Sequence, residues 1–319
     1  MHPLLPADAL IFATPRPACL LDGNHTYLTA EEVGRLAALT PLLNGQLALR
    51  DVTRSPSDEA LITRLHDAGI VFDLPVGDDG IPIALFCDYL YARIDGWRQA
   101  KPPAEWPWRT VIADGKATIR YLQGILVENY HYVRAAAARQ SPLLSQAAPG
   151  AAFYLLREFV VDKVMHERYF LDALTQWGVN PGEVETSVPL TATAQFIALQ
   201  YCLAHLSVLD YLAGSAVLEV DPAAYACAGD PYQQWETAYG LDPQILVPVR
   251  EHIRSDMAGN HAQLLCVVAG ASGQSMLPTG TAVRLLQSAR MMFEATRLWQ
   301  RGIYEHYFVQ GGGLVKASL

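Results

Sequence analysis

The chain has 319 residues, 51% of them hydrophobic and 17% charged, which is enough apolar material for a large buried core and too little charge for a disordered chain. Its formal net charge of −9 argues against an extended nucleic-acid-binding surface. No run of about 18 apolar residues predicts a membrane span, and the N-terminus lacks the basic start and apolar core of a secretory signal.

The five cysteines are scattered along the chain and form no Cys-x-x-Cys pair; they are Cys19, Cys87, Cys202, Cys227 and Cys266. This pattern fits reduced thiols in the cytoplasm better than a disulfide framework or a zinc ribbon. Because the length is typical of two domains, we expect a cytoplasmic protein with two globular parts.

Residues 1–76 are predicted to form a small α+β domain. Three short apolar or β-rich runs are separated by proline, glycine and asparagine and predict strands; they cover 9–13, 18–23 and 25–29. Thr29 can cap a following helix, with Glu32 completing a capping box. A second helix within 55–69 precedes another apolar strand, so the domain is expected to be winged-helix-like.

Residues 77–108 are interpreted as a connector. They contain four prolines, which limit long regular structure, and three tryptophans, Trp97, Trp106 and Trp108. We expect the tryptophans to cover a face of a neighbouring domain.

Residues 109–319 are helical in pattern almost throughout. Five long stretches cover 117–140, 151–178, 191–220, 242–270 and 281–308. The third has a candidate break near residues 205–207. Helices joined by short polar loops predict a bundle, so the chain is expected to be mainly α.

Two of these stretches place an acid and a histidine four residues apart, as Asp162 with His166 and His252 with Asp256. This separation puts two side chains one turn apart on one helical face. Glu158, one turn before Asp162, stays an alternative acid. An acid–histidine pair at this spacing is also common as an ordinary surface ion pair.

Two further candidates complete the pattern. Glu219 follows an apolar run, where a charge should be paired or ligated, although a simple helix-end charge is the alternative. His261 lies nine residues after His252, about 180° away on an ideal helix. It can rejoin the same face only if a π-bulge or an unwound turn forms at Gly259–Asn260.

Three carboxylates and three imidazoles suit iron or manganese and can form a cage for two ions between helices. Such a set leaves coordination positions open for dioxygen and substrate. Glu128 and His131, three residues apart on the first long helix, are candidates to line a substrate pocket. Their alternative is an ordinary polar role on an amphipathic helix.

Residues 109–319 resemble the heme-oxygenase-like diiron oxidases and oxygenases, whose fold is shared with thiaminase-type (TenA) and pyrroloquinoline-quinone-synthase (PqqC) proteins. The resemblance rests on the stretches DKVMHERYFLDAL, GSAVLEV and REHIRSDMAGNH and on their order. It implies a heme-oxygenase-like bundle with Fe(II), as two ions, at a site made by Asp162, His166, Glu219, His252, Asp256 and His261. The second iron is often held weakly in this family.

Two features depart from the family pattern. The first acid is usually glutamate and is Asp162 here, which shortens its reach and keeps Glu158 open. The final histidine usually follows the aspartate after two residues, whereas four residues separate Asp256 from His261. This departure puts the role of His261 and the occupancy of the second metal position in question.

The N-terminal domain resembles the winged-helix precursor-recognition domains of ribosomal peptide modification. The resemblance lies in the course of three strands, a helix, and a helix followed by a strand. It implies that a leader peptide adds as a strand near Tyr27–Thr29 and packs on the helix around Leu61–Leu65. A domain that merely caps the bundle is the alternative.

Together these features predict a nonheme dimetal oxidase or oxygenase that uses dioxygen on a peptide or amino-acid-derived substrate in natural-product biosynthesis. Hydroxylation, desaturation and carbon–carbon cleavage all stay open, as does a homodimer. One alternative is a cofactor-free enzyme of the same fold, similar to PqqC or TenA. The other is a non-catalytic peptide-binding adaptor.

Overall fold

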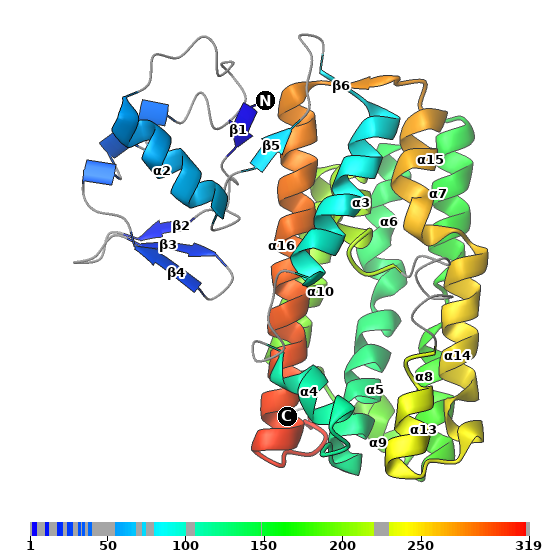
Figure 1. The fold of residues 1–319 in the computed structure, drawn as a ribbon. Coiled ribbons are helices and arrows are strands. Elements are labelled where there is room, and N and C mark those ends of the chain that lie inside the picture. Colours follow the sequence, from blue (N-terminus) through cyan, green and yellow to red (C-terminus); the bar gives the residue numbers. More distant parts are fainter. Residues whose placement is uncertain are drawn as a thin grey trace.

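The computed structural model describes residues 80–99, 106–147, 149–219 and 230–316 continuously, and from the first 79 residues it describes 2–4, 10–12, 18–21, 24–27, 31–32, 34–35, 38–39, 55–67 and 72–74. Figure 1 shows the later stretches as helices standing side by side in one bundle, with the N-terminal pieces beside it. The prediction of a mainly α chain is confirmed.

The bundle is built from ten helices of eight residues or more in the described part of the chain. They are α3 (Ile83–Gln99), α5 (Ile119–Arg134), α6 (Ala136–Gln146), α7 (Ala151–Asp162), α8 (Glu167–Gln176), α10 (Thr191–Leu206), α11 (Val208–Ser215), α14 (Pro243–Ala258), α15 (Leu264–Ala271) and α16 (Thr279–Ile303). Shorter helical pieces are α4 (Pro107–Ala113), α9 (Pro181–Thr186), α13 (Gln233–Tyr239), the 3₁₀ turn η3 (His261–Gln263) and the π-helix η4 (Tyr304–Val309).

Four of the five predicted long stretches are broken into two helices. The breaks lie at Ala135, at 163–166, at Ser207 and at 259–260. The break near 205–207 was predicted, and Ser207 explains it because its hydroxyl caps α11 by accepting from the backbone N–H of Asp210. At two other breaks Met165 and Asn260 have positive φ angles, 72° and 52°, a left-handed conformation that no α-helix continues through.

The interpretation of residues 77–108 as a connector without long regular structure is wrong. Residues 83–99 form α3, which packs against α15 and α16 and buries one face, including Phe86 and Leu90. Pro82 directly precedes this helix and therefore does not interrupt it. All three tryptophans of the segment are buried in the bundle core.

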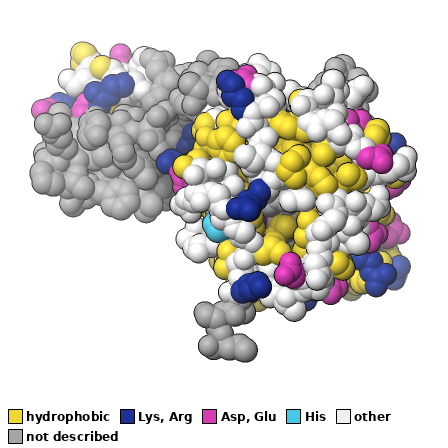
Figure 2. Space-filling model, turned by 90° about the horizontal axis from the view of Figure 1, so that it is seen from below, with side chains coloured by type: hydrophobic (Ala, Val, Ile, Leu, Met, Phe, Trp, Pro, Cys, Tyr) yellow, Lys and Arg dark blue, Asp and Glu magenta, His cyan; other side chains and the backbone are white. Residues whose placement is uncertain are grey.

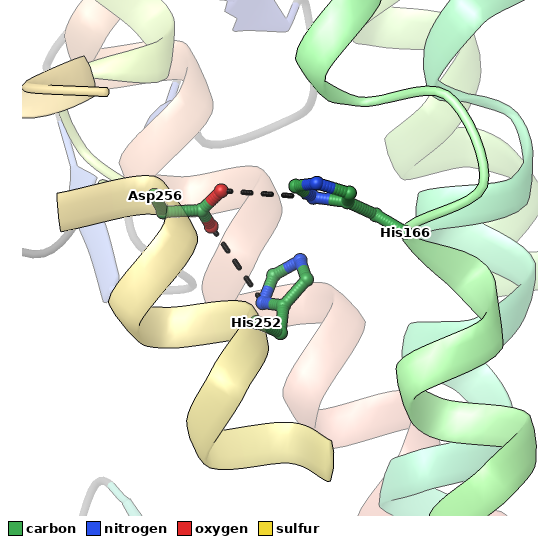
Figure 3. A group of neighbouring side chains, drawn as sticks. All are labelled: His166, His252 and Asp256. Carbon is green, nitrogen blue, oxygen red and sulfur yellow. Dashed lines mark ion pairs between the residues drawn. The ribbon is translucent and has the colours of Figure 1, made fainter. Parts of the chain in front are cut away.

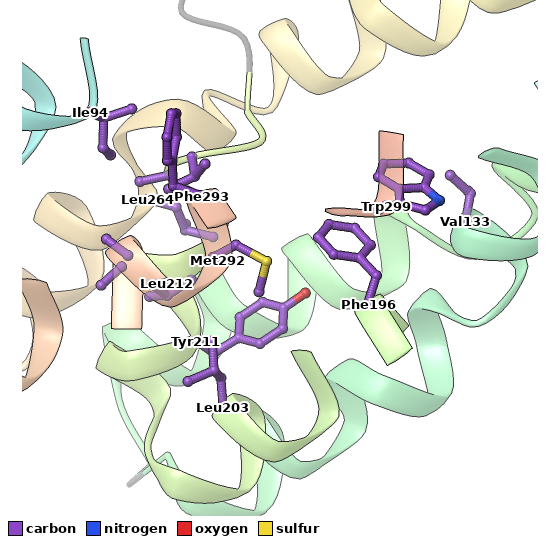
Figure 4. Close-up of a cluster of buried hydrophobic side chains, with 14 of the residues drawn as sticks. Ile94, Val133, Phe196, Leu203, Tyr211, Leu212, Leu264, Met292, Phe293 and Trp299 are labelled. Atoms are coloured by element: carbon purple, nitrogen blue, oxygen red, sulfur yellow. The ribbon is translucent and has the colours of Figure 1, made fainter. Parts of the chain in front are cut away.

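The core runs along the inner faces of α5, α10, α11 and α16. Figure 4 shows part of it, where Phe196 from α10 and Trp299 from α16 stack with ring centroids 4.6 Å apart. Met292 and Tyr211 extend the same layer. Figure 2 views the bundle from below and shows hydrophobic surface between isolated charged side chains.

Two links tie α3 to the later helices. The short strands β6 (Ile81–Pro82) and β7 (Met276–Leu277) pair antiparallel at the start of α3 and α16. Cys87 on α3 and Cys266 on α15 form a disulfide. The expectation that all cysteines stay reduced is therefore wrong for this pair, because the fold joins residues that are 179 positions apart in sequence.

The N-terminal part follows the predicted order of three strands, helical residues, a helix and a strand, and has one further strand at residues 2–4 that was not predicted. Strands β2 (Leu10–Phe12), β3 (Ala18–Leu21) and β4 (Asn24–Tyr27) form an antiparallel sheet in that order, and β1 (His2–Leu4) pairs with β5 (Phe72–Leu74). Helix α2 (Pro56–Asp67) is tied to the preceding helical residues by ion pairs of Arg64 with Glu32 and of Arg35 with Asp58. The predicted cap Thr29 lies outside the described residues. None of the described helices combines the length and the apolar character that a membrane span requires.

Candidate metal centre

The sequence predicted that Asp162 and His166 share one continuous helix, but in the structure they do not. Asp162 is the last residue of α7, a turn follows with Met165 in the left-handed region, and His166 directly precedes α8. The turn nevertheless keeps the pair together, with His166 Nε2 3.7 Å from Asp162 Oδ2. Local unwinding therefore replaces helical spacing as the cause of their proximity.

His252 and Asp256 do share a face of α14, as predicted. His252 Nδ1 lies 3.6 Å from Asp256 Oδ2, and His166 Nδ1 approaches Asp256 Oδ1 to 3.9 Å from the other side. Figure 3 shows the two imidazoles reaching the same carboxylate, His252 from α14 and His166 from the turn before α8. Phe170 packs against the His252 ring at 5.0 Å and helps to fix its orientation.

His261 reaches the same place because the chain unwinds after α14. Asn260 adopts φ 52° and ψ 37°, and the 3₁₀ turn η3 begins at His261. The imidazole lies 3.4 Å from Asp256 and 3.6 Å from Asp162. Gly259 permits this approach, since a Cβ at that position would lie 2.4 Å from His261 Nε2. The unwound turn at Gly259–Asn260, which the sequence analysis required for His261 to rejoin this face, is therefore present.

Glu219 also reaches the cluster, whereas Glu158 does not. Glu219 follows α11 in a turn, and its Oε2 lies 3.9 Å from His261 Nδ1. Glu158 is exposed on α7 and has no ion pair with the cluster among the described residues. The geometry thus favours Asp162 over Glu158 as the acid of this helix.

Five of the six residues form two overlapping groups whose ligand atoms lie within 4.8 Å of one another in each group, and Glu219 lies beside the second group. The first group is His166, His252 and Asp256, and the second is Asp162, Asp256 and His261. Metal–ligand bonds of about 2.0–2.2 Å place two ligands of one ion no more than about 4.4 Å apart. The six pairwise separations range from 3.4 to 3.9 Å, which is long for hydrogen bonds but compatible with shared ions.

Three buried polar atoms of this cluster have no hydrogen-bond partner among the described residues: Asp162 Oδ2, His166 Nδ1 and His261 Nδ1. Buried polar atoms are almost always satisfied, because leaving one unpaired costs about 1–3 kcal/mol. An ion bound between these atoms would satisfy them. The donor set of carboxylates and imidazoles is suited to iron or manganese.

Lys163 is a residue of the cluster that the sequence analysis missed. It is 7% exposed, and its ammonium pairs with Asp256 Oδ1. Burial acts to lower the pKa of Lys163, but the carboxylates of Glu219 and Asp256 outweigh burial and raise it. The signal was present in the sequence, since Lys163 lies in the apolar run FVVDKVM, where any charge needs a partner.

The protonation states of His166, His252 and Asp256 favour metal binding. Burial lowers the pKa of His252 to about 4 and also lowers that of His166, so both imidazoles are neutral at pH 7 and keep a free lone pair. Burial acts to raise the pKa of Asp256, but His261 and Lys163 outweigh burial and hold it well below its usual value. Burial raises the pKa of Glu219.

A cavity of about 400 Å³ adjoins the cluster. Lys163, Glu219, His252 and Asp256 line one part of its wall, and the remaining wall includes arginines, tyrosines and tryptophans. The volume lies in the usual range for a small-molecule site. Arg109 and Arg139 also line the wall, and the sequence analysis did not identify either of them as a candidate site residue.

Glu128 and His131 lie elsewhere and do not line this cavity. The Glu128 carboxylate is fully buried and accepts hydrogen bonds from Leu190 N, Thr193 Oγ1 and Tyr307 Oη. His131 Nε2 is 2.9 Å from the Ser187 hydroxyl. These contacts tie both residues to neighbouring elements of the bundle, and their role at a substrate stays a prediction.

Comparison with known proteins bears on the fold. No protein-family model and no curated protein sequence matches this chain. The chain is similar to a solved domain of unknown function from Shewanella denitrificans OS217 with a heme oxygenase-like fold, at 18% identity and a TM-score of 0.56, covering 74% of this chain and 95% of that one.

Two weaker likenesses are TenA homologues. One from Pseudomonas syringae pv. tomato DC3000 has 11% identity and a TM-score of 0.45, covering 70% of this chain and 91% of that one. Another from P. horikoshii OT3 has 11% identity and a TM-score of 0.41, covering 70% and 100%. The protein has a mainly α, heme oxygenase-like fold with a small α+β part at its N-terminus.

Proposed function

We propose that the chain is a nonheme, iron-dependent oxidoreductase that uses dioxygen on an amino-acid- or peptide-derived substrate. The observation that carries the proposal is the meeting of three carboxylates and three imidazoles from four separate segments beside a cavity. A structural metal site is usually closed by its protein ligands, whereas this one borders open space. The arrangement is that of a site which meets a substrate.

The chain's own residues would hold the ions in a defined way. Asp256 belongs to both groups, with Oδ2 toward His252 and Oδ1 toward His166 and His261, so it would be the shared ligand. Glu219 and Asp162 would complete the second position. Two bound Fe(II) ions, or manganese, would supply the redox chemistry with dioxygen that no side chain provides.

The surrounding residues orient the ligands and shield them from water. Phe159 packs edge-on against His261 at 4.9 Å, and Phe170 packs against His252 at 5.0 Å. Lys163 balances the charge of Asp256 from within the cluster. The rings of His252 and His261 are thereby held in place before any ion arrives.

A direct test is anaerobic loading with Fe(II), followed by mixing with air-saturated buffer and measurement of dissolved oxygen. We expect the loaded protein to consume oxygen faster than free Fe(II), and the metal-free protein to consume none. The double variant His166→Ala, His252→Ala should show only the rate of free Fe(II). Oxygen use by the variant equal to that of the wild type would overturn the proposal.

The same experiment separates the proposed function from its two rivals. Neither a cofactor-free enzyme of the same fold nor a peptide-binding adaptor predicts oxygen consumption that depends on Fe(II) loading. The unsatisfied atoms Asp162 Oδ2, His166 Nδ1 and His261 Nδ1 favour the metal-dependent function. A site that works without an ion has no reason to leave them buried.

We also propose that the N-terminal part binds a leader peptide as an added strand. The supporting observation is that β4 (Asn24–Tyr27) is at the edge of its sheet, paired with β3 alone among the described residues. Leu28 and Thr29, also predicted to take part, lie outside those residues. Amide hydrogen exchange at Asn24–Tyr27 with a candidate precursor peptide should show protection; protection only in the bundle would contradict this role.

A further inference from the structure

The cavity beside the metal cluster carries more positive than negative charge. Four basic side chains line it, Arg98, Arg109, Arg139 and Lys163, against the two carboxylates of Glu219 and Asp256. Metal ions bound by the cluster would engage both carboxylates and increase the positive excess. A cavity of this kind attracts an anion, because its low-dielectric walls strengthen the interaction with charge.

Arg139 is the most deeply buried of these side chains. It is 3% exposed, its Nε has no hydrogen-bond partner, and it interacts with the charge of Glu219 without forming an ion pair among the described residues. Its guanidinium stacks on the Tyr132 ring at 4.1 Å and donates from Nη1 to the Tyr132 backbone carbonyl. Tyr132 in turn packs against Phe196 and Trp299. The guanidinium is therefore fixed in place with donor capacity left for a ligand.

Arg109 adds a second positive charge nearer to solvent. Its exposed side chain stacks on Trp106 at 4.4 Å and pairs with no carboxylate in the described part of the chain. Although the residue as a whole is exposed, burial of part of its side chain and the positive charge of Arg98 lower the pKa of Arg109, so an anion nearby would be favourable. By contrast, Arg98 pairs with Asp95 and Lys163 with Asp256.

An apolar cavity of about 220 Å³ continues from this region. Arg109, Asn129, Trp299 and Gln300 line both cavities, so the two adjoin. The rest of the smaller wall is apolar or aromatic, with Trp108, Ile112, Tyr121, Ile125, Trp235 and Ile303. This extension suits the hydrophobic body of a ligand whose charged group stays in the larger cavity.

We propose that the cavity binds an organic carboxylate with an apolar or aromatic body, and that Arg139 holds its carboxylate. The binding of this ligand class does not depend on the proposed function. Only its identification as the substrate rests on that function. A planar guanidinium matches a carboxylate through two parallel N–H donors. The carboxylate is bound by protein side chains and needs no metal ion.

The test is calorimetric titration of the full-length, metal-free protein with 3-phenylpropanoate and, as its uncharged partner, 3-phenylpropanamide. We expect the acid to bind about tenfold or more tightly than the amide, the usual effect of a charge-assisted hydrogen bond. Arg139→Gln should abolish the difference, and Arg139→Lys should restore part of it. Arg157→Gln is the matched control, because Arg157 is exposed, stacks on Tyr154 and does not line the cavity.

Arg109→Gln keeps the test decisive if Arg139 variants fail to fold. Arg109 is exposed and its loss should weaken binding of the acid a few-fold, less so at high salt, because exposed charges are screened. Equal binding of acid and amide by the wild type, or no binding of either, overturns the proposal. Binding of the acid only after Fe(II) loading also overturns it, by placing the carboxylate on the metal. Loss of oxygen chemistry with retained acid binding would instead count against the proposed function alone.

Discussion

Lys163 is the residue that most affects how the cluster behaves without metal. Its ammonium pairs with Asp256 Oδ1, the oxygen that also lies 3.4 Å from His261 Nδ1. A buried carboxylate requires a compensating charge, and Lys163 supplies one in the absence of an ion. It therefore competes with an ion at the Asp162–Asp256–His261 group.

Replacing Lys163 with methionine should separate its compensation of the Asp256 charge from its competition with an ion. We expect the melting temperature of the metal-free protein to fall by several degrees, because Asp256 loses its buried partner. The gain in melting temperature on adding Fe(II) should exceed that of the wild type, because an ion no longer competes with an ammonium. Lys116→Met is the control, since Lys116 pairs with Asp114 on the exposed surface. An equal Fe(II)-induced gain in the wild type and Lys163→Met would contradict this view.

Gly259 controls the position of His261. In Gly259→Ala the new Cβ would lie 2.4 Å from His261 Nε2, so the imidazole must move. We expect about tenfold or greater loss of affinity for the ion at the His261 group, as metal sites lose 10- to 100-fold when ligand orientation fails. Equilibrium dialysis with Fe(II) measures this.

Gly270→Ala is the matched control on α15, because a Cβ there meets nothing within 4 Å. Its metal content should equal that of the wild type. Full metal content in Gly259→Ala would show that His261 is not a ligand.

At the scale of elements, the breaks between helices create the cluster. The turn at 163–166 and the turn at 259–260 each redirect a histidine toward Asp256. The sequence predicted the existence of the helices and the spacing on α14, because apolar periodicity and i, i+4 spacing are local properties. It did not predict the left-handed residue Met165, because a methionine carries no local preference for that conformation.

The difference between local sequence pattern and long-range packing also explains why residues 77–108 were wrongly interpreted as a connector. The proline-rich flanks of α3 were visible in the sequence, but the burial of α3 depends on contacts with α15 and α16, far along the chain. Tertiary packing decides whether such a segment is a helix of the core. The cavity arginines were equally invisible, since Arg139 lies in the run AAAARQ and shows no partner until the fold is known.

Glu128 joins three elements through its carboxylate: its own α5, the residues before and within α10, and the π-helix η4. Glu128→Ala should lower the free energy of unfolding by about 3 kcal/mol, because three buried donors lose their acceptor. Its metal content should stay at the wild-type value. Glu158→Ala, at an exposed position, should change neither quantity. Loss of metal with unchanged stability in Glu128→Ala would assign Glu128 to the site instead.

For the whole molecule, burial of histidine makes stability depend on pH. Burial lowers the pKa of His131 from its ordinary 6.5 to about 4. At a pH between about 4 and about 6.5, the unfolded chain binds a proton on His131 that the folded protein does not bind. The free energy of unfolding therefore falls as the pH drops from about 6.5 to about 4. The full contribution of His131 is about 3 kcal/mol.

His131→Gln should flatten this dependence in the metal-free protein while keeping a polar contact with Ser187. Urea unfolding at several pH values measures the effect, with exposed His205→Gln as the control. The imidazoles of buried His166 and half-buried His252, whose pKa values are also lowered, contribute a remaining slope. An unchanged slope in His131→Gln would contradict the assigned cause.

The whole bundle brings residues from α7, α11, α14 and η3 and the turns beside them to one place. The most direct test of this convergence is crystallisation of the full chain after anaerobic Fe(II) loading, with anomalous scattering recorded at the iron edge. We predict two peaks that share Asp256, one beside His166 and His252 and the other beside Asp162, Glu219 and His261. Iron peaks confined to other places, or none at all with the protein fully loaded, would contradict a dimetal centre here.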